Sequence, residues 1–74
     1  MIGDIKRHLQ EDVFIPFTIH MADGRKIHVP TRDHIALSPA RAIVTHDDNT
    51  WDLLPGLLMT GLTVDVPAPH PGQS

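Results

Sequence analysis

The sequence predicts a mainly β domain, with one short N-terminal helix and about five short antiparallel strands in a curled sheet or small open barrel. Three observations lead to this fold class. Apolar residues recur at helical spacing near the N-terminus, whereas from residue 17 onward they alternate with polar ones. Clusters of turn-forming residues separate the alternating segments at short intervals. The 74 residues suffice for one small domain, which we expect to span residues 1–66, followed by a disordered Pro-rich tail at 67–74.

The N-terminal segment 1–12 is the helical candidate. Ile2, Ile5 and Leu9 stand at spacing i, i+3 and i+7, which places them on one helical face. A helix of this length is marginal in water when isolated. We therefore expect its apolar face to pack on the rest of the domain or, alternatively, on a partner chain.

A β-hairpin is predicted around residues 22–24, Ala-Asp-Gly. Apolar side chains alternate with polar ones on both sides of this turn. A two-residue loop would place the apolar side chains of the two strands on opposite faces, whereas a three-residue loop with Gly24 at positive φ places them on one face. In that register Ile19 pairs with Ile27, and the opposite face of the hairpin is polar. This possible polar hairpin face consists of His20, Lys26 and His28.

The rest of the chain predicts further short strands at residues 35–37, 42–46, 51–54 and 62–66. Residues 57–60 fit either one helical turn or an extended segment. Alternation along the strands predicts which side chains form the core, with Val44 on the opposite side of its strand. The predicted core consists of Ile5, Leu9, Phe17, Ile19, Ile27, Val29, Ile35, Leu37, Ile43, Leu53 and Leu62.

The ordered part of the sequence also carries a recognisable succession of short motifs. It begins with FIPFTIHMADGR at residues 14–25, continues with IALSP at 35–39 and ends with LLMTGLTV at 57–64. This succession resembles a group of small uncharacterised bacterial proteins with an N-terminal helix, a PF-x-PF-like entry and a D-G-R hairpin. The resemblance covers about residues 2–66 and implies a small domain with no established activity. Pro55-Gly56 departs from the group's pattern, which has an acidic and an apolar residue there.

The order of the predicted elements is similar to that of the Sm-like fold, which includes bacterial Sm-like RNA chaperones. That fold also has a helix, then a strand, a turn and more short strands in a bent sheet. Its last strands pair between subunits and build a ring. The similarity is one of element order, and no RNA-binding motif carries over to this sequence.

The composition excludes several classes of site. The sequence has no cysteine, which excludes disulfides, thiolate zinc ligands and cysteine nucleophiles. The formal net charge is −3 with neutral histidines, which does not predict strong non-specific binding to nucleic acid. Apolar runs are short, such as Leu57-Leu58-Met59, whereas a membrane-spanning helix needs about 20 apolar residues. We expect a cytoplasmic protein that does not enter a membrane.

No pattern in the sequence indicates a metal site or a catalytic site. None of the six histidines forms an HxH or HExxH motif, and the hairpin register brings only His20 and His28 together, fewer than the four ligands of a structural zinc site. Asp33 and His34 would point to opposite faces of a strand, so Asp33 would not orient His34 as in a catalytic triad. The acidic residues within 47–52 are interpreted as turn-forming. We therefore expect no enzyme, no metal and no cofactor.

Self-association is the function that the apolar residues favour. The C-terminal third carries more aliphatic side chains than so short a chain buries easily, and clustered exposed apolar residues indicate interfaces. We expect a non-enzymatic binding or structural module that forms a homo-oligomer, with Trp51 half exposed and an unpaired edge strand at 62–66. The possible interface consists of Leu54, Leu57, Leu58 and Met59.

The alternative is an Sm-like RNA-binding oligomer. All six Lys and Arg residues lie within residues 1–41, and a weak basic patch would be repeated in a ring of subunits and would gain avidity. The possible nucleic-acid contacts in this alternative are Arg25, Lys26, Arg32 and Arg41.

Overall fold

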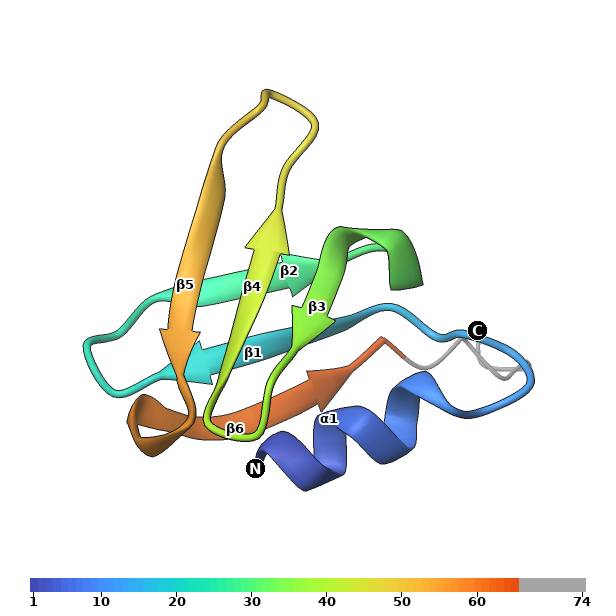
Figure 1. The fold of residues 1–74 in the computed structure, drawn as a ribbon, viewed down its shortest axis with the longest axis horizontal. Coiled ribbons are helices and arrows are strands. Elements are labelled where there is room, and N and C mark those ends of the chain that lie inside the picture. The colour runs from blue at the N-terminus through green and yellow to red at the C-terminus, as the bar shows by residue number, and fades with distance from the viewer. Residues whose placement is uncertain (66–74) are drawn as a thin grey trace, which may run out of the picture.

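Within residues 1–65, six strands form two three-stranded antiparallel sheets in the computed structural model (Figure 1). The first, which we call the hairpin sheet, has the order β2-β1-β6, and the second, the meander sheet, has the order β3-β4-β5. The structure describes residues 1–65, so Val66 and the predicted tail at 67–74 lie outside the described residues. The elements are α1 (Ile2–Leu9), β1 (Phe17–Met21), β2 (Lys26–Val29), a 3₁₀ turn η1 (Arg32–His34), β3 (Ile35–Leu37), β4 (Arg41–Thr45), β5 (Trp51–Pro55), a 3₁₀ turn η2 (Gly56–Leu58) and β6 (Met59–Val64).

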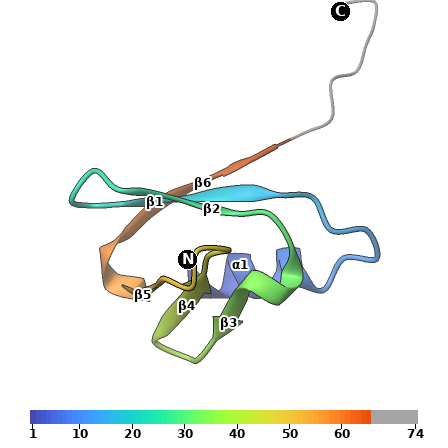
Figure 2. The ribbon, with the colours of Figure 1, turned by 90° about the horizontal axis from the view of Figure 1, so that it is seen from above.

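The prediction of a mainly β fold with one N-terminal helix is confirmed, but the single curled sheet or barrel is wrong. The strands of the meander sheet cross in front of those of the hairpin sheet (Figure 1), and the two sheets lie at different levels when seen from above (Figure 2). The backbone leaves the hairpin sheet after Val29, because Pro30 has no N–H group to continue the ladder. Thr31 then caps η1, and its side chain accepts a hydrogen bond from the Asp33 N–H. The chain returns to the hairpin sheet only through η2.

The predicted hairpin is confirmed in detail. Ile19 pairs with Ile27, and the Met21 N–H donates to the Arg25 carbonyl at 2.9 Å, so the loop has three residues. Gly24 has a φ of 93°, in the left-handed region that glycine tolerates best. Strand β6 pairs with the other side of β1, where Ile19 lies opposite Leu62. Strand β1 is therefore the central strand of the hairpin sheet.

The helix packs on the rest of the domain, as one of the two sequence alternatives predicts. Ile5 is fully buried, and Ile2 and Leu9 pack against the core with partial exposure. In Figure 2, α1 lies between the levels of the two sheets. The helix ends at Leu9 rather than at residue 12. Leu9 is also the last residue of the apolar i, i+3, i+7 series.

The core of the meander sheet differs from the prediction. Ala42, Val44 and Leu54 are fully buried, whereas Ile43 and Leu53 point outward and are 38% and 41% exposed. Both strands carry apolar residues at consecutive positions, so alternation alone does not specify which face is buried. The remaining predicted core residues are buried or pack against the core. The buried core consists of Ile5, Phe17, Ile19, Met21, Ile27, Val29, Ala42, Val44, Leu54 and Met59.

Candidate interaction surface

The outer face of the hairpin sheet is polar. His20 lies opposite Lys26, and His28 lies diagonally beside them, opposite Thr18. The structure therefore places the three residues of the predicted polar hairpin face side by side. His20 Nε2 shares a hydrogen bond with Thr63 Oγ1 at 2.6 Å, and His28 Nδ1 one with Thr18 Oγ1 at 3.3 Å. These contacts lie across the strands and hold both imidazoles within the face.

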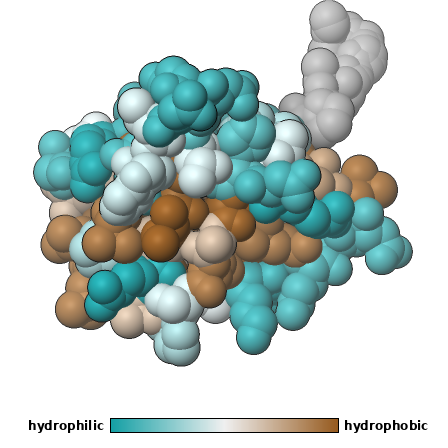
Figure 3. Space-filling view, turned by 45° about the horizontal axis from the view of Figure 1, so that its top comes forward, coloured by the Kyte–Doolittle hydropathy of each residue, from teal (hydrophilic) through white to brown (hydrophobic). Residues whose placement is uncertain are grey.

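The outer face of the meander sheet is apolar. Its centre is the cross-strand pair Ile43 and Leu53, and Ala36 lies on the other side of Ile43. Trp51 lies at one end of the face and is 62% exposed, and Pro55 lies at the other end. We call this set of five residues the apolar face. Figure 3 shows a band of hydrophobic surface across this side of the molecule, bordered by hydrophilic surface.

The residues of the predicted interface divide into two groups. Leu57 and Leu58 in η2 are 99% and 47% exposed. Leu54 is fully buried and Met59 is 8% exposed, so both belong to the core rather than to an accessible surface. Leu54 points inward because it alternates with Leu53, and Met59 pairs with Met21 of the central strand.

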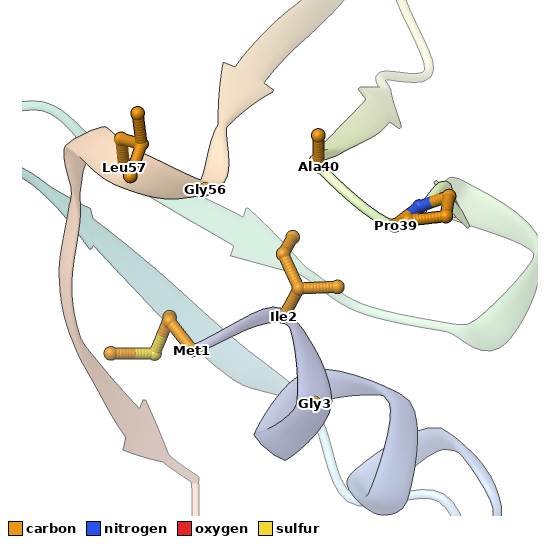
Figure 4. Close-up of a pocket in the computed structure, with 7 residues that line it drawn as sticks. All are labelled: Met1, Ile2, Gly3, Pro39, Ala40, Gly56 and Leu57. Atoms are coloured by element: carbon orange, nitrogen blue, oxygen red, sulfur yellow. The ribbon is translucent and has the colours of Figure 1, made fainter.

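A shallow apolar groove of about 540 Å³ runs between the start of α1, the β3–β4 turn and η2 (Figure 4). Gly56 is tightly placed at its edge: its N–H donates to the Ala40 carbonyl at 2.8 Å, and a Cβ there would lie 3.0 Å from Ile2 Cγ1. The absence of a side chain at Gly56 therefore lets η2 lie against the β3–β4 turn. Among the described residues, those that line the groove carry only apolar side chains or none. It is lined by Met1, Ile2, Gly3, Pro39, Ala40, Gly56 and Leu57.

The basic residues proposed as nucleic-acid contacts do not form one patch. The Arg25 Nε lies 2.9 Å from Asp23 Oδ2, and its guanidinium also reaches Asp52 at 3.6 Å. Arg32 donates to the carbonyls of Leu9 and Glu11. The remaining two basic residues lie on different sheets, Lys26 on β2 and Arg41 on β4. Half of this set is therefore engaged in contacts within the chain.

Hydrogen bonds lower the pKa of two turn carboxylates. The pKa of Asp23 lies below its usual value because the Arg25 backbone N–H and guanidinium donate to its carboxylate. The pKa of Asp48 is lowered chiefly by the Thr50 hydroxyl and backbone N–H, which donate at 2.5 and 3.0 Å. Both carboxylates are hydrogen-bonded within turns. For Asp48 this agrees with the interpretation of the acidic residues within 47–52 as turn-forming, whereas Asp52 lies in β5 and its carboxylate contacts His46.

A contact that the sequence did not indicate links the two sheets. His46 Nε2 donates to Asp52 Oδ2 at 2.8 Å, and the same carboxylate lies 3.6 Å from the Arg25 guanidinium at the hairpin turn. Asp52 lies two residues before Leu54 and therefore shares the inward side of β5 with it. This two-residue spacing is the sequence signal for the inward position of Asp52. Within residues 1–65, no group of three or more His, Asp or Glu residues is arranged to hold a metal ion.

Comparisons with protein-family models, curated proteins and solved structures give no significant match. In the described part of the chain, no helix is both long and apolar enough to cross a membrane.

Proposed function

We propose that this chain is a small non-enzymatic interaction module that associates with itself, and that its apolar face is the contact surface. The observation that carries the proposal is the outward position of Ile43, Trp51 and Leu53 on adjacent strands of one sheet. Single exposed apolar residues are normal on a protein surface, but a contiguous apolar sheet face is typical of an interface. The polar outer face of the hairpin sheet provides the contrast within the same molecule.

We place the protein in the cytoplasm on composition alone, because the sequence has no cysteine.

The size of the apolar face favours weak association. The face is three strands wide and five residues long, about 14 by 17 Å at usual strand spacings. A standard interface buries about 800 Å² on each partner, and smaller ones belong to transient complexes. We therefore expect a dimer that dissociates on dilution. The basic residues do not favour RNA binding, because Arg25 and Arg32 are engaged within the chain.

The test is the solution mass measured by light scattering over a wide range of protein concentration. We expect the mass to rise from that of one chain, 8.2 kDa, toward twice that value. Ile43→Lys should hold the mass at that of the monomer, because it places a charge at the centre of the apolar face. Val13→Lys is the matched control, since Val13 is an apolar residue that is 74% exposed outside the sheets. A wild-type mass that stays at one chain at the highest concentration would refute the proposal.

A further inference from the structure

We infer that two copies of this chain pair face to face through their apolar faces in an antiparallel arrangement, with Arg41 of each copy reaching the acidic β4–β5 turn of the other. The inference rests on the proposed self-association and specifies its orientation. It identifies Arg41 and Asp47 as the residues that determine this orientation.

Charged residues flank the apolar face along the direction of β4, a positive one at one end and a negative one at the other. Arg41 begins β4, and it forms no ion pair with any residue in the described range 1–65. Asp47 follows the other end of β4, and its side chain is 94% exposed although it accepts a hydrogen bond from His34 Nε2. Between these ends, the outward side chains of β4 are the uncharged Ile43 and Thr45. The charges of the surface are therefore separated along the strand direction.

A twofold axis fixes how two such faces meet. Two identical faces pack together through a twofold axis that lies in the plane between them. When the axis crosses β4 at Ile43, the strands of the two copies run antiparallel, and Ile43 and Leu53 each lie against their own counterparts. Trp51 then lies against Pro55 of the partner subunit, because these two residues occupy opposite ends of β5. The bulky exposed indole is thus matched with a proline rather than with a second indole.

The same axis brings opposite charges together. Arg41 precedes Ile43 by two residues and Thr45 follows it by two, which is about 7 Å in each direction at a usual strand rise. Arg41 of one copy therefore lies over Thr45 of the other, and Asp47 is two residues further on, within reach of a long side chain. In a parallel arrangement Arg41 would instead meet Arg41, and Asp47 would meet Asp47. Charge complementarity therefore selects the antiparallel dimer.

The experiment is a charge exchange followed by light scattering or sedimentation. Arg41→Glu and Asp47→Arg should each weaken the homodimer about tenfold or more, because every interface contains two copies of the altered pair. An equimolar mixture of the two variants should form a heterodimer, in which Glu faces Arg at one end and Asp faces Arg at the other. The double variant should regain self-association.

Lys26→Glu is the control for net charge. It makes the same change in charge as Arg41→Glu, but it lies on the polar face of the hairpin sheet and should leave the dimer unchanged. If the wild type dimerises but the single reversals do not weaken it, or if the mixture stays monomeric, this orientation is wrong while self-association stands. If the wild type is monomeric at every concentration, the proposed function fails, and this inference fails with it.

Discussion

Replacing Leu54 and Leu53 separately by alanine tests which face of the meander sheet belongs to the core. The two residues are neighbours in β5 and chemically identical, but Leu54 is fully buried and Leu53 is 41% exposed. Removing a fully buried leucine side chain costs about 2–5 kcal/mol, since a cavity remains in a packed core. Removing the partly exposed one should cost roughly 1 kcal/mol, because much of its surface already faces water. Leu54→Ala should therefore be the far less stable variant.

The assay is urea unfolding followed by circular dichroism at the lowest workable protein concentration, so that self-association does not add to the measured stability. In thermal unfolding, each kcal/mol shifts the midpoint of a domain of this size by about 4–8 °C, so Leu54→Ala should melt at least about 8 °C below the wild type. Leu53→Ala should melt within several degrees of it. Equal losses, or a larger loss for Leu53→Ala, would mean that the apolar face is part of the core and would refute the interaction surface.

Three further predictions concern turns and close contacts. Gly24→Val should lower the free energy of unfolding by at least about 1–2 kcal/mol in urea titrations, because Gly24 has a φ of 93°; a neutral result would contradict the three-residue loop. Gly56→Ala should cost about 1–3 kcal/mol by the same measurement, since the new Cβ would lie 3.1 Å from the Ala40 carbonyl oxygen, whereas Gly61→Ala has open space and should not destabilise. The lowered pKa of Asp48 means that its stabilising effect is present above its unfolded value of 3.8 and is lost as the pH falls through the lower folded value. Asp48→Asn should therefore unfold at a urea midpoint that changes less with pH below 3.8 than that of the wild type, and an unchanged acid dependence would contradict the assignment.

The local structure of the hairpin can be predicted almost completely from the sequence. The spacing of Ile19 and Ile27 about the turn distinguishes a three-residue from a two-residue loop, because only one loop length places both side chains on the buried face. The helix is similarly defined by its apolar spacing, and Ile5 is buried as that spacing predicts. Both elements depend on residues close together in the chain, where the period of the pattern is unambiguous.

The meander sheet could not be predicted in the same way. Ala42, Ile43 and Val44 are all apolar, and so are Leu53 and Leu54, so either face of these strands could have been buried. The choice is made by packing against α1 and the hairpin sheet, which is a tertiary effect that alternation does not contain. For this reason the sequence predicts Leu54 in the interface and Ile43 in the core, whereas packing buries Leu54 and leaves Ile43 38% exposed.

The division into two sheets has a comparable origin. The breaks occur at η1 and η2, two short 3₁₀ turns that redirect the chain. Pro30 and the Thr31 cap form the first break, and Gly56 forms the second through its close approach to Ala40. Each signal is visible in the sequence as a turn, but neither specifies that the following strand joins another sheet.

The most direct test of the interaction surface is a dilution series followed by two-dimensional amide NMR of the wild-type chain. We predict that the backbone signals of Ile43 and Leu53 and the indole signal of Trp51 shift with concentration, while those of Thr18 and Thr63 on the polar outer face stay fixed. These shifts would assign self-association to the apolar face. Spectra that do not change with concentration, or shifts confined to the outer face of the hairpin sheet, would contradict the account.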